Sequence, residues 1–460
     1  MSRFKMLALA AASALSFPLP VQASPEQTAR LRDAALADTL AWDITEGLTT
    51  EIGQRKAGSD AEARARDWAV AKLKALGFSN VRIETFDIPY WERGIATAEI
   101  TAPFPQQLIL TALGNSGATP DKGLTAEVIG FDSLDELKAA DPAAVKGKIV
   151  FVTHRMAPAQ DGSPYGPVGN VRRQGPSIAS KLGAAAILIR SIGTDHHRVP
   201  HTGVQDWSNG AKPIPAAALS NPDADQLERV LKRGKPVSIA LTITAKMAGK
   251  RQSGNVIAEI TGRDPAAGIV LVGGHLDSWD LGTGAIDDGT GVAITTAAAK
   301  HILDAGQPLR TIRIVWFGSE EIGSFGGTNY FDRHKAEKHH VAAESDFGAD
   351  RVWRFETRVT DAAVPAMKPI AAALLPLGIV QGHNGTADGS DLDELAKSGV
   401  PIIALSQDGT RYFDLHHTAD DTLDKVDPAQ LRQNVAAWTA MLSVVANDPT
   451  EYGPVTGKTE

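Results

Sequence analysis

In the second half of the chain, short apolar runs typical of strands alternate with longer segments typical of helices. Apolar runs such as 268–274 and 310–320 have the length and β-branched composition of buried strands, and the segment 291–303 between them has the length of a helix. Strands that alternate with helices form largely parallel sheets with helices on their faces. We therefore expect an α/β fold with a largely parallel central sheet from Asn255 onward, closed by a helix that begins at Asp427 and Pro428.

An amphipathic helix is predicted closer to the N-terminus, over residues 59–77. Ser59 and Glu62 have the spacing of a capping box, and Gly77 is a typical helix end. The residues that share its apolar face are Ala65, Trp68, Ala69, Leu73 and Leu76. A strand is expected to follow over residues 81–88.

Between these two regions the pattern changes to short alternating strands, such as 147–154 and 235–244, with one helix-strand pair at 177–189. We interpret residues 95–250 as a separate β-rich domain inserted into the α/β domain, which would comprise residues 24–94 and 251–446. The joints are expected at the proline-marked segment 89–94 and the polar segment 248–254. Residues 447–460 are predicted to be a loosely held C-terminal tail.

The first residues have the composition of a cleaved secretory signal. Arg3 and Lys5 precede an apolar stretch over residues 6–17, and a small-residue site follows at residues 21–23. This stretch is much shorter than the roughly 20 apolar residues that cross a bilayer. Residues 1–23 are therefore predicted to be a signal peptide, which implies a periplasmic or secreted protein with no membrane attachment after cleavage.

Charge and cysteine content narrow the function classes further. The formal net charge is −8, which disfavours nucleic acid as a partner. Because the chain has no cysteine, it forms no disulfides, and any zinc ion would need nitrogen and oxygen ligands.

Polar residues follow several of the predicted strands, where ligands bind in open parallel sheets. His275 and Asp277 follow the first run, with Asp287 and Asp288 before the next helix, and the pair Glu320-Glu321 follows the second run. Asp346 and the pair His416-His417 lie in later polar segments. Each of these groups alone is more often ordinary surface polarity, and His416-His417 also fits a core histidine with an exposed neighbour. Their joint placement favours a zinc site, in which one glutamate binds metal and its neighbour accepts a proton.

Together these motifs resemble a known family. The segments "GGHLDSWD", "GAIDDGTG", "EE" after a strand, "ESD" and "HHTADDT" are similar to those of the di-zinc exopeptidases, which include bacterial aminopeptidases and glutamate carboxypeptidases. The similarity is greatest to the plasma glutamate carboxypeptidases, and "PYWERG", "LIRSIG", "HTGVQDW" and "VIAEITG" extend it over nearly the whole chain after residue 23. It also implies that residues 95–250 form a protease-associated-like domain.

The resemblance implies a specific ligand set for two Zn²⁺ ions per chain. His275 and Asp346 would bind one ion, and Asp287 would bridge the two ions. Glu321 and His417 would complete the sets of ligands around them. Glu320 would be the general base, and Asp277 would orient His275. The family's Gly-Ala-x-Asp-Asp order selects Asp287 over Asp288. His417 is selected over His416 because it directly precedes a Thr and lies four residues before Asp421.

Other positions are less clearly assigned by the resemblance. Residues 201–203 either approach the active site or form an ordinary surface loop, and Asp391 is a candidate for contact with a substrate amine. The segment "IGSFGGTNYF" after Glu321 departs from the plasma glutamate carboxypeptidases near the expected specificity pocket, so side-chain preference stays open. Four histidines outside the motifs are expected to be solvated: His196, His197, His339 and His340.

The predicted function is that of a zinc-dependent exopeptidase that hydrolyses dipeptides or short peptides. The alternatives are an aminopeptidase acting on longer peptides, a hydrolase of non-peptide amides, and a non-catalytic binding protein of the same fold. A homodimer is implied by the relatives alone.

Overall fold

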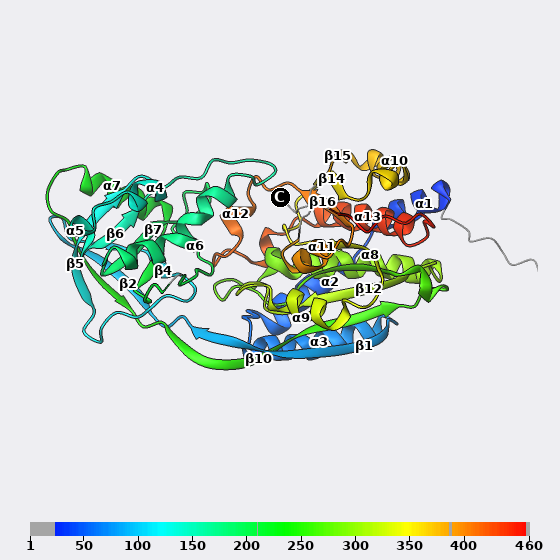
Figure 1. The fold of residues 1–460 in the computed structure, drawn as a ribbon, viewed down its shortest axis with the longest axis horizontal. Coiled ribbons are helices and arrows are strands. Elements are labelled where there is room, and N and C mark those ends of the chain that lie inside the picture. The colour runs from blue at the N-terminus through cyan, green and yellow to red at the C-terminus, as the bar shows by residue number, and fades with distance from the viewer. Residues whose placement is uncertain (1–23, 209, 386–388, 457–460) are drawn as a thin grey trace, which may run out of the picture.

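Two lobes, each built on an eight-stranded sheet, make up the computed structural model, which describes residues 24–208, 210–385 and 389–456 (Figure 1). The predicted signal peptide therefore lies outside the described residues. The predicted α/β class is confirmed, because the sheet of the first lobe has helices on both faces.

The sheet of the first lobe has the strand order β1-β10-β12-β11-β13-β16-β14-β15. The four inner strands β12, β11, β13 and β16 are parallel to one another. The pairs β1–β10, β10–β12 and β16–β14 are antiparallel, and the edge strand β15 pairs in parallel with β14. The strands span β1 (Ser79–Glu92), β10 (Lys246–Ile260), β11 (Ile269–His275), β12 (Thr311–Phe317), β13 (His339–Glu344), β14 (Val352–Arg358), β15 (Val380–Asn384) and β16 (Ile402–Gln407). The sheet is thus parallel in its centre and mixed at its edges.

Helices cover this sheet because their apolar faces complete two separate cores. The larger core lies on the face covered by α1 (Pro25–Ala35), α2 (Leu40–Gly47), α3 (Asp60–Ala75), α8 (Thr290–Ala305), α10 (Lys368–Leu374) and α13 (Pro428–Val445). The smaller core lies under α9 (Phe325–His334) and α11 (Asp393–Lys397). Among the described residues, no helix combines the length and apolarity needed to cross a membrane.

The predicted helix near the N-terminus is present as α3, and its cap joins it to the sheet. The Oγ of Ser59 accepts a hydrogen bond from the N–H of Glu62 at 3.1 Å. The buried carboxylate of Glu62 pairs with Arg66 at 2.6 Å and accepts a hydrogen bond from the Oγ of Ser253, in β10, at 2.6 Å. The Ser59 cap therefore fixes the start of the helix, while the Glu62 carboxylate, which accepts from the N–H of Gly58 rather than from that of Ser59, fixes its position on the sheet.

The second lobe comprises residues 96–243 and has the strand order β3-β2-β9-β5-β6-β7-β8-β4. Its strands are β2 (Ala96–Ala102), β3 (Gln106–Leu108), β4 (Leu110–Ala112), β5 (Leu124–Phe131), β6 (Ile149–Val152), β7 (Ala186–Arg190), β8 (Ala216–Leu219) and β9 (Ser238–Ile243). The helices are α4 (Leu134–Lys138), α5 (Pro142–Val145), α6 (Tyr165–Lys181) and α7 (Asn221–Leu231). Separate hydrophobic cores on the two faces of this sheet show that the lobe has its own interior.

A two-stranded ribbon connects the lobes, as the long β1 and β10 in Figure 1 show. The antiparallel pairing runs from Ser79 opposite Glu259 to Glu92 opposite Lys246. The segments expected as joints, 89–94 and 248–254, thus lie mostly within strands. The exposed polar residues 250–252 explain why the pattern there is typical of a linker, whereas Ser253 is buried and Arg93 pairs with Asp280.

The expectation of a loose tail is wrong for residues 447–456. Tyr452 is fully buried, and its hydroxyl donates to the carboxylate of Asp448 at 2.9 Å. The buried guanidinium of Arg310 donates from Nη2 to the backbone carbonyl oxygens of Asp448 and Thr450. A single aromatic anchor and one arginine therefore hold a segment whose composition is otherwise polar.

Candidate metal centre and active site

The candidate site lies at the carboxyl ends of the central parallel strands. His275 is the last residue of β11, Ser319 to Glu321 follow β12, and Asp346 follows β13. These strands are neighbours, so their ends meet at one edge of the sheet, as the sequence pattern predicted.

His275 lies at the centre of this group and is fully buried. Its Nε2 lies 3.1 Å from Oδ1 of Asp287 and 3.4 Å from Oδ1 of Asp346. Its Nδ1 lies 2.9 Å from the backbone carbonyl oxygen of Asp277, which is positioned to accept a hydrogen bond from that nitrogen. This contact orients the ring so that Nε2 faces the two carboxylates.

Asp277 supports the site differently from the sequence-based expectation. Its carboxylate is 3.7 Å from Nδ1 of His275, and it accepts hydrogen bonds from the backbone N–H groups of Glu320 and Glu321 at 3.1 and 3.3 Å. The backbone of Asp277 therefore orients the histidine, while its side chain fixes the turn that carries the glutamate pair. Ser319, with a φ of 65°, makes this turn possible directly after β12.

Asp287 lies between the two histidines. Its Oδ1 faces His275, and its Oδ2 lies 3.3 Å from Nε2 of His417. The two oxygens of Asp288 instead accept hydrogen bonds from the backbone N–H groups of His275 and Gly291, both at 3.0 Å. Asp288 is thus occupied by backbone donors, and Asp287 is the carboxylate whose oxygens point in two directions.

Glu321 and His417 approach Asp287 from the other side. The Nε2 of His417 lies 2.6 Å from Oε2 of Glu321, yet neither oxygen of Glu321 has a hydrogen-bond partner in the described part of the chain. Close contact without hydrogen-bond geometry is what side chains show when they converge on a common point. The buried Oδ2 of Asp287 also lacks a hydrogen-bond partner among the described residues.

These side chains fit a divalent metal centre. Buried carboxylates with unpaired oxygens are costly unless a cation neutralises them. The ligand atoms of His275, Asp287 and Glu321 lie within 4.8 Å of one another, as do those of His275, Asp288 and Asp346. A set made of imidazole nitrogens and carboxylate oxygens suits zinc.

The electrostatics of the side chains at this site reflect the same crowding of acids. Burial and the neighbouring carboxylates raise the pKa of Glu320 to about 8, against the attraction of His275. Burial and the charge of Asp287 likewise raise the pKa of Asp421 to about 7. Asp421 accepts hydrogen bonds from the backbone N–H groups of Ile286 and Asp287 at 2.6 and 3.2 Å, so it holds the segment that carries Asp287 in place.

A loop of the second lobe packs directly on His417. The N–H of Thr202 donates to the carbonyl oxygen of His417 at 3.2 Å, and the carbonyl of Thr202 lies 3.3 Å from Nδ1 of the same residue. The Nε1–H of Trp279 donates to the Thr202 hydroxyl at 2.5 Å, and its ring stacks on His417. Of the two sequence-based readings of residues 201–203, the approach to the active site is therefore correct.

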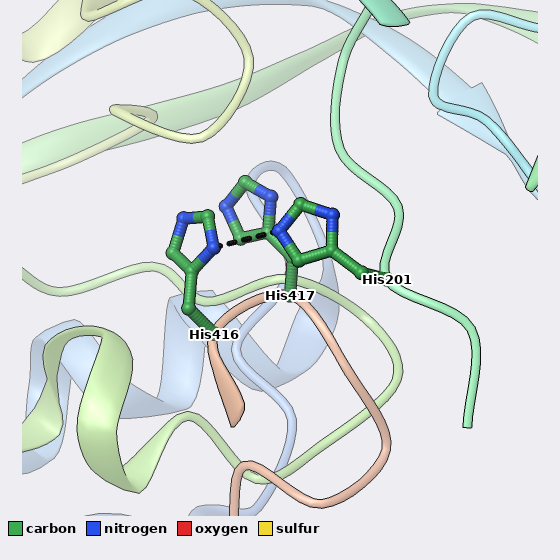
Figure 2. Close-up of side chains that lie close together, drawn as sticks. All are labelled: His201, His416 and His417. Carbon is green, nitrogen blue, oxygen red and sulfur yellow. Dashed lines mark hydrogen bonds between the residues drawn. The ribbon is translucent and has the colours of Figure 1, made fainter. Parts of the chain in front are cut away.

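His201, His416 and His417 form a compact group of rings at this junction (Figure 2). All three are buried, including His416, which one sequence-based reading left exposed. The dashed contact in Figure 2 joins Nε2 of His201 to Nδ1 of His416 at 2.9 Å. Burial lowers the pKa of His416 and of His201 well below the usual range, with further lowering by the neighbouring rings and by Arg172.

The site opens into a cavity of about 830 Å³ formed by both lobes. The second lobe contributes Tyr165, Arg172 and Arg173 from α6, and the first lobe contributes Glu320, Glu321 and Glu344 among others. Asp391 is buried beside this cavity rather than on its wall, and its N–H donates to Oε2 of Glu344 at 3.2 Å. Sequence reasoning did not single out Glu344 or Arg172. Glu344 lies within the "ESD" motif, whereas no pattern marked Arg172.

The four histidines expected to be solvated differ in their burial. His196 and His197 are exposed. His340 is buried, and its ring centroid lies 4.2 Å from that of Tyr452. The Nε2 of His339 lies 2.8 Å from the hydroxyl oxygen of Tyr330. The expectation of solvated histidines is therefore wrong for His340, because the C-terminal segment covers it.

Comparison with known proteins gives the family. The model of peptidase family M28 matches residues 255–442. Carboxypeptidase Q from Bos taurus is 36% identical over 403 residues, which cover 87% of this chain and 84% of that protein. Carboxypeptidase Q from Homo sapiens is 35% identical with the same coverage of both chains. Aminopeptidase YwaD from Bacillus subtilis is 23% identical and covers 85% of this chain and 81% of its own.

Solved structures agree with these relatives. The peptidase M28 precursor from Shewanella amazonensis is 47% identical, has a TM-score of 0.92, and covers 94% of this chain and 99% of its own. A zinc aminopeptidase from Bacillus subtilis shares the fold at 20% identity, with a TM-score of 0.64 and coverage of 90% and 97%. The predicted resemblance to zinc exopeptidases, carboxypeptidase Q among them, is thereby confirmed. The chain belongs to peptidase family M28.

Proposed function

We propose that the protein is a di-zinc exopeptidase that hydrolyses dipeptides or short peptides. The observation that carries this proposal is the position of Asp287, whose two carboxylate oxygens face His275 on one side and His417 on the other. A carboxylate in this position can be shared by two cations and reduce their mutual repulsion.

The proposed ligands follow from the contacts around Asp287. His275 and Asp346 would hold one zinc ion, and Glu321 and His417 the other, with Asp287 common to both. When bound, a pair of zinc ions would acidify a water molecule and polarise the carbonyl of the scissile peptide bond.

Glu320 is the proposed general base. It lines the cavity, and its backbone is fixed by the Asp277 carboxylate, so its side chain is directed by a rigid turn. Neutralisation of the surrounding carboxylates would lower its pKa from about 8 towards neutrality, where a carboxylate accepts a proton from water and returns it to the departing amine.

The cavity supports a short peptide as substrate. Its volume of about 830 Å³ suits a small molecule, and α6 of the second lobe restricts it on one side. The carboxyl group of Glu344, supported by Asp391, lies at the first-lobe side of the cavity and would receive the free amine of the peptide. We also propose that residues 95–250 are an inserted protease-associated-like domain whose role is this restriction.

An aminopeptidase acting on longer peptides is the second candidate, because Aminopeptidase YwaD and Leucine aminopeptidase 2 are among the relatives. The two activities differ in their need for a free C-terminal carboxylate. A purified dipeptide and the same dipeptide with an amidated C-terminus separate them: a dipeptidase prefers the free acid, and an aminopeptidase cleaves both.

The substitution Glu320→Gln tests the catalytic assignment. Zinc content should stay at about two ions per chain, while kcat falls by about 10²- to 10⁴-fold, the usual contribution of a general base. Retained peptidase activity would refute the role of Glu320. Loss of zinc from the variant would show that Glu320 is a ligand instead.

The proposed location is the periplasm or the extracellular medium, on the basis of the N-terminal signal pattern. N-terminal sequencing of the exported protein tests it, since the mature chain should begin at Ser24. The homodimer implied by the sequence resemblance is tested by the molar mass of the purified protein in solution.

A further inference from the structure

His201 and His416 form a buried pair of imidazoles next to the proposed metal ligands (Figure 2). They are 1% and 7% exposed, respectively. His416 follows α12 (Tyr412–Leu415) of the first lobe, whereas His201 lies in the loop between β7 and β8 of the second lobe. The second lobe thus reaches a residue that lines the substrate cavity.

The contacts of the pair determine which ring nitrogen carries hydrogen. At 2.9 Å, one of Nε2 of His201 and Nδ1 of His416 must donate and the other accept. The remaining nitrogen of His416, Nε2, lies 3.6 Å from Oδ2 of Asp287. A hydrogen on Nε2 is attracted by that carboxylate, whereas a lone pair would be repelled by it. Nε2 of His416 therefore carries the hydrogen, and Nδ1 accepts the hydrogen bond from His201.

The second nitrogen of His201 agrees with this arrangement. Its Nδ1 is buried and has no hydrogen-bond partner in the described part of the chain. In the assigned state this nitrogen carries only a lone pair. In the opposite state it would be an unpaired buried N–H, which native structures rarely contain.

Aromatic neighbours prevent the ring of His416 from turning. It stacks on His417 with centroids 3.6 Å apart, and it meets the rings of Tyr165 and Phe413 edge-on, each at 5.5 Å. The Nε2–H group is therefore held at a fixed point on the cavity wall, beside Asp287.

A third metal site at the three histidines does not fit. The Nη1 of Arg172 lies 3.3 Å from Nδ1 of His417 and donates to the carbonyl oxygen of Thr202 at 2.5 Å. A cation among these rings would face this guanidinium at close range, and Nε2 of His417 is already in contact with Glu321.

We infer that His416 donates the hydrogen bond from Nε2–H to the oxygen of the scissile carbonyl as that oxygen becomes negatively charged, and that His201 is the positioning residue that fixes its tautomer. This inference rests on the proposed function. The water oxygen bonds to the carbonyl carbon, and the C=O π pair moves to the oxygen that His416 stabilises. The C=O bond then re-forms, the C–N bond breaks, and the amine leaves with the proton taken from the water. His416 keeps its hydrogen throughout, so its contribution is electrostatic.

The substitution His416→Phe removes the donor and keeps the size of the ring. We expect kcat on a dipeptide to fall by about 100-fold, the typical loss of one such donor, with little change in KM and with zinc content unchanged. A phosphinic dipeptide analogue, whose tetrahedral phosphorus carries the corresponding oxygen, should lose affinity by a similar factor. His197→Gln, at an exposed histidine of the loop that carries His201, is the matched control and should behave as wild type.

Conservative variants separate hydrogen bonding from packing. His416→Gln, which retains an N–H donor, should recover part of the activity. His201→Leu should lower kcat by about tenfold, as expected for the outer partner of a site histidine, and His201→Gln, which can still donate to His416, should restore it.

The inference is overturned if His416→Phe changes KM rather than kcat, if it loses zinc in proportion to activity, or if His201→Gln is as impaired as His201→Leu. A wild-type enzyme that cleaves peptides while His416→Phe is unaffected overturns the inference alone. A zinc-loaded wild-type protein that cleaves no peptide overturns the proposed function, and the inference with it.

Discussion

Gly203 offers a direct test of whether the second lobe supports the metal centre. This residue has a φ of 125°, a conformation that suits glycine, and it directly follows Thr202, whose backbone contacts His417. In Gly203→Ala, the new Cβ would overlap the guanidinium of Arg172 and lie 2.6 Å from Nδ1 of His417. Both neighbours are buried, so neither can move into solvent.

The size of the effect follows from this distance. Non-bonded contacts of carbon atoms lie at roughly 3.5 Å or more, so His417 must recede by about 1 Å. A displacement of that size in an active site costs about 100-fold in rate, and loss of outer support typically weakens metal binding by about 10- to 100-fold. We expect Gly203→Ala to show both losses.

Gly234→Ala is the matched control. Gly234 also has a positive φ, of 70°, but an added Cβ would meet no atom within 4 Å. Gly234→Ala should lose roughly 1–2 kcal/mol of unfolding free energy from left-handed backbone strain alone, and Gly203→Ala, at a φ of 125°, should lose at least as much. Zinc affinity is measured by competition with a chelator, and stability by thermal unfolding of the zinc-free protein. Zinc affinity and kcat at the wild-type level in a folded Gly203→Ala protein would refute the proposed support.

Three further predictions concern stability. Tyr452→Ala should lower the unfolding free energy by about 3 kcal/mol because it removes a fully buried ring, and chemical denaturation would contradict this if the midpoint did not move. Hydrogen bonds that Glu84 accepts from His334 and Arg82 outweigh burial and hold the pKa of Glu84 at about 2, while the hydrogen bond that His334 donates to Glu84 raises the pKa of His334. The ion pair thus stabilises the fold between the unfolded pKa of Glu84 and the raised pKa of His334. Glu84→Gln should therefore lower the free energy of unfolding more at pH 6 than at pH 9, and an equal decrease at both pH values would contradict a contribution from the pair. In zinc-free protein, burial and the neighbouring carboxylates raise the pKa of Glu320 to about 8, so the free energy of unfolding should fall between pH 5 and pH 8 as this group loses its proton, and added zinc should reverse the loss. A free energy of unfolding that does not change over this range would contradict the repulsion between Glu320 and its neighbouring carboxylates.

The parts of the fold that follow local periodicity could be predicted from the sequence. The apolar runs before His275 and Glu320 identified β11 and β12, and the rule that parallel strands end at one edge placed their polar neighbours together. The capping residues Ser59 and Glu62 likewise located the start of α3.

Contacts between the lobes could not be predicted in the same way. Thr202 and His417 are separated by 215 positions, and their contact depends on how the two sheets are oriented. Periodicity carries no information about that orientation, which explains why the role of residues 201–203 stayed open. The resemblance supplied ligand types for the metal centre but no partner for His416.

The C-terminal segment shows a different limit of sequence reasoning. Its polar composition predicts that the segment packs weakly on the rest of the protein. That prediction fails because an average over the segment hides the contribution of a single buried residue. Burial of Tyr452 and the hydrogen bonds from Arg310 hold the segment, and the Tyr452 ring packs on His340. One buried aromatic residue can thus order a segment whose other residues are mostly polar, glycine or proline.

The antiparallel ribbon of β1 and β10 has a consequence for engineering. Trp91 pairs with Met247, so the chain leaves the first lobe and returns to it at adjacent points. A short hairpin turn could therefore replace the whole intervening stretch without stretching the backbone. Such a miniaturised chain would retain the first sheet and every proposed zinc ligand, but His417 would lose its backbone partner and His416 its neighbour. The second lobe could therefore be removed without breaking the first sheet, but its removal would take away contacts that hold His416 and His417 in place.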